Sequence, residues 1–465
     1  MRTASHSRLL SMFELTSKSF YKRTFYLMIP VVLQQLITVG INFADTVMIG
    51  GFGETQIAAA SFGNQFYSLF QFICMGLGSG AVVLSSQFWG RKEIEPMRRV
   101  AAIAMQLTLA LCVLFTVVSV GFPHWIMRVF SSETAVITVG SPYMRLIGVT
   151  FLLAGLSSTA TYLLRSVGNV RVSLVSSAIA FVLNLFFNWV FIFGKLGAPK
   201  LELVGAAVGT IIARVFEFCL VFGYFVLRDK RFGFRLRHFL LSGGSLWRSY
   251  FKFGLPVLIS DTLLGLSLTV SGMITGHVGE AAAAATSIVF NAIKLTDVLN
   301  VGMAGASAIV IGNTIGEGDI PRARREGNTY MLLSFLFGLA VIVPLILLER
   351  PYLSLYDVAP ATLAMVHGML VYNYIWMPVQ TNAYVSSKGV LRGGGDTRFI
   401  LVADSSLIWF FSIPVGAVAG LIFRADPVIV YIILRIQLPM KGFVCFFRYI
   451  TGKWIKVITA KPEEQ

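Results

Sequence analysis

The sequence is poor in cysteine and histidine, with four of the first and five of the second among 465 residues. The cysteines lie singly within apolar segments, at Cys74, Cys112, Cys219 and Cys445. Their spacing predicts neither a disulfide framework nor a metal site. No pairing of a nucleophile with a base is recognisable either, so we expect no enzyme activity and no bound cofactor.

Charged residues are scarce as well, and this excludes a soluble globular protein. They make up 13% of the chain and hydrophobic residues 56%, against roughly 25% and 45–50% in soluble domains. The apolar residues form runs of about 20, the length of a membrane-spanning helix, and not the ten-residue alternating segments of a barrel. We therefore predict an all-α membrane protein with twelve transmembrane helices. The predicted spans are residues 25–50, 57–88, 98–122, 139–164, 171–194, 203–227, 253–276, 283–313, 327–349, 363–389, 399–422 and 427–448.

Acidic residues are fewer than basic ones, 22 against 38, which gives a net charge of +16. In a soluble chain this excess would suggest a nucleic-acid partner. Here the basic residues gather on one side of the predicted spans, as do Arg91 and Lys92 after the second span and Arg324 and Arg325 after the eighth. The positive-inside rule then places both termini in the cytoplasm, in a plasma membrane that we expect to be a bacterial inner membrane, with no nucleic-acid partner. The basic segment 1–23 holds no apolar core before a cleavage site, so no removable signal peptide is expected.

The chain contains an internal duplication. The segment 29–54, IPVVLQQLITVGINFADTVMIGGFGE, shares its frame with 255–280, LPVLISDTLLGLSLTVSGMITGHVGE, 226 positions later. The shared positions pair Pro30 with Pro256, Gly50 with Gly276, Gly53 with Gly279 and Glu54 with Glu280. With one inserted residue, 164–171 lies over 391–398. Because each half has an even number of spans, we expect a pseudo-two-fold axis along the membrane normal and a ligand site near the midplane.

The duplication also sets the expected domain boundaries. A cytoplasmic N-terminal segment, 1–23, precedes an N-terminal six-helix lobe, 24–227. The most charged loop of the chain, 228–250, is the expected cytoplasmic linker. A C-terminal six-helix lobe, 251–450, and a cytoplasmic tail, 451–465, complete the chain.

Four motifs carry a resemblance to a known family. They are ADTVMIGGFG from Ala44 to Gly53, NLFFNWVFIFGKLGAP from Asn184 to Pro199, IGNTIGEGD from Ile311 to Asp319, and VLRGGGDTRF from Val390 to Phe399. In order, spacing and duplication they resemble the multidrug and toxic compound extrusion (MATE) family of cation-coupled antiporters, over residues 24–456. The resemblance implies a V-shaped pair of six-helix lobes that exports organic, often cationic or amphipathic compounds in exchange for protons or sodium ions.

Asp45 is the first candidate for cation coupling. An aspartate in hydrocarbon costs about 2.5–3.5 kcal/mol, so we expect it to face a protein interior or a water-filled cavity. The resemblance matches Asp45 to the family's first-span acid, which is tied to cation coupling, although its depth also fits a residue at the outer helix end. Asn184 and Asn188 lie four apart on one helical face and can line one cavity; the resemblance makes them neighbours of Asp45. Many relatives have an aspartate in place of Asn188, which argues against a two-carboxylate site here.

Asp261 is the second candidate for cation coupling. It lies about 13 Å into the seventh span at 1.5 Å per residue, near mid-bilayer, and resembles a glutamate of many relatives. Its counterpart in the first half is Gln35, a candidate for the substrate cavity. On the eighth span Lys294 and Asp297 are three apart and can pair on one helix face. With Asp261 they form either a proton-dependent switch in the substrate cavity or a structural pair that ties the two helices together.

Aromatic residues are plentiful, with 38 phenylalanines, and most are expected to pack or to face lipid. A few must line the cavity if flat cations bind, because ring faces attract cations. The candidates are Phe66 and Tyr67 on the second span, with Trp376 and Met377 on the tenth. The expected partners are small organic cations or amphipathic drugs and the membrane lipid, around a monomer.

Other polar residues in the spans give weaker indications. Thr381 stands where sodium-coupled relatives have an acid, which weakens the sodium site that the resemblance allows. Asp404 is a further cavity candidate, and Arg214 with Glu217 is expected to form an internal pair. The glycines after Arg392 lack the lysine of a phosphate loop, so they predict a cytoplasmic turn with Arg392 at the lipid headgroups.

Rival functions stay open at this point. The main hypothesis is antiport by alternating access, in which a proton or sodium ion at Asp45 or Asp261 competes with the cargo. A flippase for lipid-linked glycan precursors shares the broad architecture, but it would want an arginine-rich cavity for a pyrophosphate headgroup. The spans offer few central cations besides Lys294. A channel would need rings of repeated ligating groups, and the sequence shows no such repeat.

Overall fold

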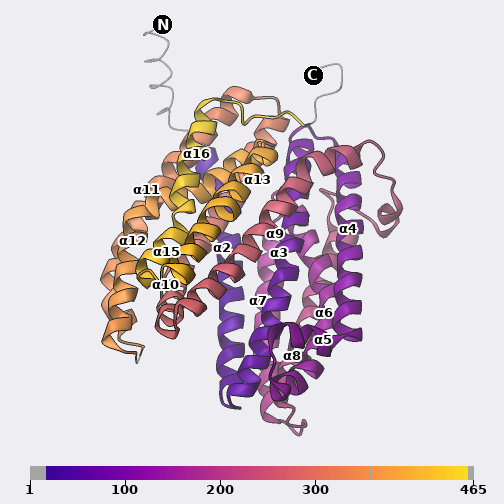
Figure 1. The fold of residues 1–465 in the computed structure, drawn as a ribbon. Coiled ribbons are helices and arrows are strands. Elements are labelled where there is room, and N and C mark those ends of the chain that lie inside the picture. Colours follow the sequence, from indigo (N-terminus) through magenta and orange to yellow (C-terminus); the bar gives the residue numbers. More distant parts are fainter. Residues whose placement is uncertain (1–16, 357, 459–465) are drawn as a thin grey trace. The chain divides into compact units, whose positions relative to one another are not determined.

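The computed structural model describes residues 17–356 and 358–458, and this part of the chain is helical with no strand. Within each compact unit the long helices pack side by side (Figure 1). The first half contains α2 (Lys18–Gly50), α3 (Glu54–Gly90), α4 (Ile94–Gly121), α5 (Pro123–Phe130), α6 (Thr134–Ser166), α7 (Arg171–Phe193), α8 (Glu202–Gly223), η1 (Tyr224–Arg228) and η2 (Leu236–Leu240). The second half contains α9 (Leu246–Val278), α10 (Glu280–Gly316), α11 (Ile320–Leu353), α12 (Pro360–Val385), η3 (Ser386–Leu391), α13 (Thr397–Ser405), η4 (Ser406–Ser412), α14 (Ile413–Ala417), η5 (Val418–Ile422), α15 (Pro427–Arg435) and α16 (Gln437–Ile450).

The helices correspond to the predicted spans. Eleven helical segments of the described chain are long and apolar enough to cross a membrane. With α12, which takes the place of the tenth predicted span, they give the expected twelve, and α5 is an additional short helix. Large apolar side chains remain exposed along them, such as Leu347 at 71% and Phe410 at 82%. Helices satisfy their own backbone hydrogen bonds, so such apolar faces can lie in lipid.

The described residues divide into two compact units. Unit 1 comprises those within Met1–Ile29, Ser86–Lys92 and Ile259–Gln465, and unit 2 those within Pro30–Ser85 and Glu93–Leu258. Two helices therefore change unit along their length, α2 at Pro30 and α9 two residues after Pro256. These are the two prolines that the duplication pairs. A proline inside a helix removes one backbone hydrogen bond and so permits a bend at that point.

In unit 2, α3 and α9 cross at very short range. A side chain added to Gly80 would place its Cβ 2.9 Å from the Cα of Gly254. The Tyr250 hydroxyl donates a hydrogen bond to the Leu77 carbonyl at 2.9 Å beside this crossing. Small residues at such crossings let helix backbones approach one another in a membrane, where packing drives helix association. The first part of α9 is thus held in unit 2 by backbone packing and one hydrogen bond.

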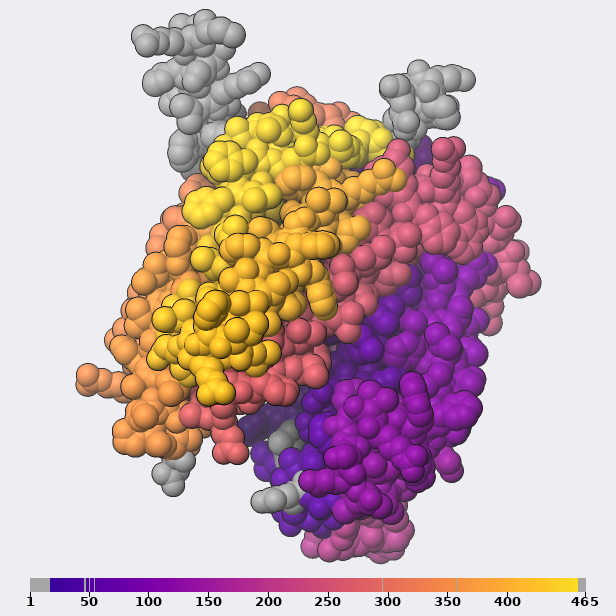
Figure 2. Space-filling model, in the orientation of Figure 1, coloured from indigo at the N-terminus to yellow at the C-terminus, as the bar shows by residue number. Residues whose placement is uncertain are grey.

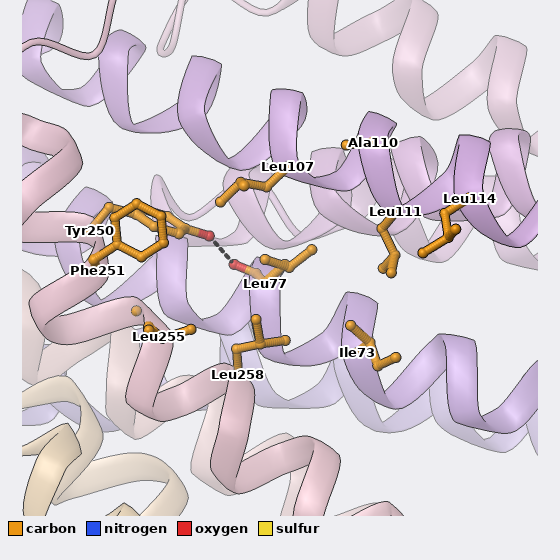
Figure 3. A pocket seen from close by; sticks show the side chains of 11 residues that line it. Ile73, Leu77, Leu107, Ala110, Leu111, Leu114, Tyr250, Phe251, Leu255 and Leu258 are labelled. Carbon is orange, nitrogen blue, oxygen red and sulfur yellow. Dashed lines mark hydrogen bonds between the residues drawn. The ribbon is translucent and has the colours of Figure 1, made fainter.

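An apolar cavity of about 320 Å³ lies beside this crossing in unit 2 (Figure 3). It is lined by α3, α4 and α9, through Ile73, Leu77, Leu107, Ala110, Leu111, Leu114, Tyr250, Phe251, Gly254, Leu255 and Leu258. The one polar side-chain group among these is the Tyr250 hydroxyl, which already donates to Leu77. A cavity without a charged side chain offers no site for a cation, and the candidate residues lie elsewhere.

The loop predicted as a linker, 228–250, folds against α4 in unit 2. Phe232 and Phe234 are fully buried. Arg98 Nε donates to the Phe232 carbonyl at 3.0 Å, and Gln106 Nε2 donates to the Phe239 carbonyl at 2.5 Å. The charged loop is therefore held against α4 by buried aromatic side chains and by hydrogen bonds.

In unit 1, the start of α2 and the C-terminal helices pack around α10 to α12. The hydroxyls of Thr24 and Tyr330 lie 2.7 Å apart and join α2 to α11. Figure 2 shows α15 and α16, in yellow, beside the orange α13 on one face of this unit. The segments η3, η4 and η5 are π-helical. Such segments are rare and often occur at functional sites.

Candidate functional site

The polar cluster of unit 2 is formed by Asp45 on α2, Asn184 and Asn188 on α7, and Thr210 on α8. Asn188 Nδ2 donates to Asp45 Oδ1 at 2.6 Å. Asn188 also donates to Asn184 Oδ1 at 3.3 Å, and Asn184 Nδ2 donates to Thr210 Oγ1 at 3.4 Å. Asp45 is half-buried, whereas the two asparagines are 3% and 0% exposed. The structure thus brings together the three residues that the sequence analysis proposed, and it adds Thr210.

The sequence places these side chains together through a close approach of α7 and α8. Gly209 on α8 lies directly against Asn188, and any side chain at 209 would clash with the amide. Asn184 and Asn188 are one helical turn apart, so both face α8 and α2 from the same side of α7. The glycine next to Thr210 is therefore what allows the amides to stack between two helices.

The donor atoms of the cluster suit a small hard cation. They are the carboxylate of Asp45, the side-chain oxygens of Asn184 and Asn188, and the Thr210 hydroxyl, and oxygen ligands are what such cations prefer. The Asn188 Oδ1 atom is buried and accepts no hydrogen bond from the described part of the chain. Buried polar atoms normally have a partner, and this oxygen lies against Gly209 of α8 without one among the described residues. With a single carboxylate, the cluster carries one negative charge and fits one proton or one monovalent cation.

A second polar group lies near this cluster in unit 2. Arg214 Nη1 pairs with Glu217 Oε2 at 2.5 Å, as expected from their spacing. The Arg214 guanidinium lies 5.8 Å from the centre of the Tyr67 ring, and the Tyr67 hydroxyl accepts from Gln71 at 2.7 Å. Tyr67 stacks on Phe151 with ring centres 5.8 Å apart. The face of Tyr67 is thus already in contact with a planar cation, which is the interaction predicted for a cargo.

Gln35 is half-buried on α2, and no hydrogen bond joins it to the polar cluster of unit 2 in the described structure. Its neighbour Gln34 donates to Ser177 at 3.0 Å and accepts from Arg165. The hydrogen-bonded glutamine of this pair is therefore Gln34. Gln35 was predicted to line the substrate cavity because the internal repeat pairs it with Asp261.

Asp261 lies in a buried ionic cluster of unit 1 and not beside Lys294. It is 0% exposed and receives Lys388 Nζ at 2.6 Å. Arg392 donates to both of its oxygens, at 2.8 and 3.0 Å. The prediction that Arg392 lies at the lipid headgroups is wrong, because the side chain turns into the protein and is 5% exposed. A bidentate pair between an arginine and a carboxylate is among the strong charge-assisted hydrogen bonds of proteins.

Asp404 completes this ionic cluster. Lys441 Nζ lies 2.5 Å from its Oδ1, Lys388 Nζ lies 3.5 Å from its Oδ2, and the Ser260 hydroxyl donates to it at 2.7 Å. Asp404 is 2% exposed, so it faces packed protein and not an open cavity. Lys388 and Lys441 were missed at the sequence level. Both leave a signal in the sequence, since Lys388 stands at the end of the predicted span 363–389 and Lys441 within the span 427–448.

The pair expected between Lys294 and Asp297 is not formed. Within the described chain no ion pair of 4.0 Å or less joins them. Lys294 is half-buried with its amine 6.0 Å from the centre of the Phe290 ring, while Asp297 is exposed. Arg435 and Lys294 are the charged groups that interact electrostatically with Asp297. The suggested switch of one lysine and two acids therefore does not exist at Lys294.

The aromatic candidates of unit 1 are Trp376 and Met377 on α12. Trp376 is half-buried and meets Phe443 edge to face, with ring centres 6.4 Å apart. Met377 is 3% exposed and packs within the helix bundle. Trp376 thus retains accessible surface, whereas Met377 has almost none.

Comparison with known proteins agrees with the duplicated architecture. The MatE family model matches residues 30–190 and again residues 256–418. The two matches start 226 positions apart (256 − 30), the offset of the internal repeat. The model thus covers both halves and most of the chain.

Several curated and solved proteins are similar along almost the whole chain. A probable multidrug resistance protein YoeA of Bacillus subtilis is 25% identical over 395 residues, 84% of this chain and 85% of that protein. The multidrug resistance protein NorM of Vibrio vulnificus is 24% identical over 401 residues, 84% and 86% of the two chains. A solved multidrug resistance MATE family transporter in an outward-facing conformation has a TM-score of 0.82 at 19% identity, covering 96% of this chain and all of its own. From these matches, and from the helices and repeat described above, the chain belongs to the MatE family of membrane transporters.

Proposed function

We propose that this protein is an antiporter that exports organic, often cationic compounds by alternating access, driven by a proton or sodium gradient. The observation that carries the proposal is the polar cluster of unit 2, where one intramembrane carboxylate, Asp45, is half-buried among oxygen donors. The multidrug resistance names of its relatives support the cargo class. An intramembrane acid of this kind is functional by default, because the membrane makes it costly to keep.

The chemistry at Asp45 is an exchange of positive charges. When a proton or a sodium ion binds, it neutralises the carboxylate, with Asn184, Asn188 and Thr210 able to supply further oxygens. When that cation leaves, the negative charge returns and attracts a cationic cargo. Cargo and coupling cation therefore bind in competition, which links the gradient of one to the transport of the other.

We propose that cargo contacts come from polar and aromatic residues in each unit. In unit 2 these are Gln35 and Tyr67. The Tyr67 ring suits a flat organic cation, since a guanidinium already lies over it. In unit 1 the proposed residues are Lys294, Asp297, Trp376 and Met377.

The proposal extends to the setting of the protein. We place it as a monomer in the bacterial inner membrane, in contact with membrane lipid, with both termini cytoplasmic. Its two six-helix lobes are 24–227 and 251–450, joined by 228–250. The distribution of basic residues in the sequence supports this orientation.

A flippase for lipid-linked glycan precursors is less well supported by the geometry. Such a protein needs accessible cations for a pyrophosphate headgroup. The cations gathered in unit 1, Lys388, Arg392 and Lys441, are buried and engaged by Asp261 and Asp404. They stabilise carboxylates of the protein and leave little capacity for an external anion.

Transport in sealed vesicles tests the proposal. The purified protein is reconstituted, and proton and sodium gradients are imposed separately while uptake of a panel of organic cations, including ethidium, is followed by fluorescence. We expect at least one gradient to drive transport, and dissipation of that gradient to stop it. Equal uptake with and without both gradients across the panel would contradict coupled antiport.

A further inference from the structure

The ionic cluster of unit 1 has an odd charge. Its members are Asp261 on α9, Lys388 in η3, Arg392 just after η3, Asp404 on α13 and Lys441 on α16. Three cations against two carboxylates give +1. All five side chains are buried, between 0% and 8% exposed. Buried charges are normally neutralised by partners, because removing an uncompensated ion from water costs several kcal/mol.

The contacts identify the cation that is in excess. Asp261 has a complete partner in Arg392, which reaches both carboxylate oxygens. Asp404 forms an ion pair with Lys441 at 2.5 Å and accepts a hydrogen bond from the Ser260 hydroxyl. Lys388 is the third cation beside these two pairs. Its Nζ lies 2.6 Å from the Asp261 carboxylate and 3.5 Å from the Asp404 carboxylate. If Lys388 gives up its proton, two neutral ion pairs remain and the cluster carries no net charge.

Lys388 and Arg392 both contact Asp261, and of these two side chains only that of Lys388 can lose its proton. An arginine stays protonated in proteins, whereas a buried lysine exchanges its proton readily. The neutral amine of Lys388 would still donate to Ser260, now 3.3 Å away, and to Asp261. The accessible surface of the cluster lies on the cations, at 6–7% of each side chain, and hardly on the carboxylates, at 0–2%.

The backbone at Lys388 is also unusual. The lysine lies in the π-helical segment η3, and Asp404 is followed closely by another such segment, η4. Gly389 packs so closely on α10 that any side chain there would clash with Ser307. Irregular helix turns of this kind often accompany functional side chains. Here the turn aims the amine between two carboxylates on other helices.

The groups that face Lys388 come from each neighbouring element. α9 contributes Asp261 and Ser260, α13 contributes Asp404, α16 contributes Lys441 and Cys445, and the segment of Lys388 itself contributes Arg392 and Tyr384. α10 meets η3 through the uncharged Ala304 and Ser307. α11 contacts the preceding turn through Met331 and Ser334, which hydrogen-bond Asn382.

We propose that Lys388 is a second proton-binding site of the transporter, in unit 1 and separate from Asp45. Lys388 releases its proton to water at one stage of the transport cycle and takes one up at another, so the cluster alternates between neutral and singly positive. Asp261 acts in coupling as the counter-ion of this lysine. The role of Lys388 in transport rests on the proposed antiport. Proton binding by Lys388 can be measured without any cargo.

Nuclear magnetic resonance of the full-length protein in lipid nanodiscs tests the proton binding. With lysines labelled at Cε, the Lys388 signal is assigned by its loss in Lys388→Arg, and the Lys441 signal by its loss in Lys441→Arg. Between about pH 5 and pH 9 a free lysine stays protonated, since it titrates near 10.4. We expect the Lys388 signal to shift across this range and the Lys441 signal to stay in place. A Lys388 signal that does not move, or joint movement of both signals, would overturn the proposal.

Transport in vesicles under a proton gradient tests the role in coupling, with ethidium as the probe. Lys388→Arg keeps the charge but cannot release it, and Lys388→Met removes it. We expect both variants to lose proton-driven transport by about 10-fold or more, while the control Lys195→Arg, at an exposed lysine outside the cluster, stays within about 2-fold. Normal transport by Lys388→Arg would refute the coupling role. If the wild type transports under neither gradient, the antiport proposal fails, and the nuclear magnetic resonance result still decides whether Lys388 binds the proton.

Discussion

The two units use intramembrane acids in opposite ways. In unit 2, Asp45 is half-buried, and the described hydrogen bond to its carboxylate comes from the neutral amide of Asn188. In unit 1, Asp261 is fully buried and held by two cations, Lys388 and Arg392. One acid is left able to accept an external cation, and the other is already neutralised by the protein. A shared ancestral frame therefore does not imply shared chemistry, and the charge count of each cluster indicates what it can bind.

The largest effect on stability is expected from breaking the Asp261 pairs. Arg392→Gln leaves a buried carboxylate short of its bidentate partner and should cost about 3–5 kcal/mol in the free energy of unfolding. Asp45→Asn should change it by less than about 1 kcal/mol, because the residue is half-buried and no ion pair of 4.0 Å or less is described for it. Unfolding in detergent, followed by fluorescence against denaturant, measures both. Similar losses for the two variants would remove the contrast between the units.

An intermediate effect is expected from giving unit 2 a second acid. The substitution Asn188→Asp would place a second carboxylate about as close to Asp45 as the Asn188 amide is now. Two carboxylates at that separation cannot both ionise without an energetic cost. We expect the variant to be less stable than the wild type by about 1–3 kcal/mol at alkaline pH, where both lose their protons. Sodium should reverse the loss, and so should lowering the pH. Melting temperatures at pH 5 and pH 9, with sodium or with choline as the control cation, measure this effect. A loss that is the same at both pH values would contradict it.

The smallest effect is expected at Thr210. Thr210→Val removes a neutral oxygen from the polar cluster and should weaken binding of the coupling cation by roughly 5-fold, about 1 kcal/mol. Thr210→Ser keeps the hydroxyl and serves as the matched control. Transport rates at increasing concentrations of the coupling cation give the apparent affinity of each. Equal affinities for the valine and serine variants would place Thr210 outside the site.

Much of the fold follows from local sequence patterns. The apolar runs, the repeat offset of 226 and the paired Pro30 and Pro256 predicted twelve helices in two related halves. The same reasoning brought Asn184 and Asn188 to one face, because residues four apart on a helix are neighbours whatever the tertiary structure. Their proximity to Asp45 was implied by the family resemblance, and Thr210 was not predicted.

Local sequence patterns could not predict the ionic cluster of unit 1, because the residues that meet in it are far apart in the sequence. Asp261 meets Lys388 and Arg392 across 127 and 131 positions, and Ser260 meets Asp404 across 144. The spacing of Lys294 and Asp297 allowed a local pair, but spacing gives only an opportunity, and the two side chains do not meet. For Arg392, the neighbouring glycines suggested a surface turn, while the structure uses them to pack the segment closely against α10 and the C-terminal residues.

Exchange of the coupling cation at Asp45 can be tested by measuring transport. Cation-driven uptake of ethidium is compared in vesicles that contain the wild type, Asp45→Asn or the exposed control Glu133→Gln, at equal amounts of folded protein. We predict that Asp45→Asn loses at least about 10-fold of the gradient-driven rate, while Glu133→Gln transports as the wild type does. Undiminished gradient-driven uptake by Asp45→Asn would contradict the account.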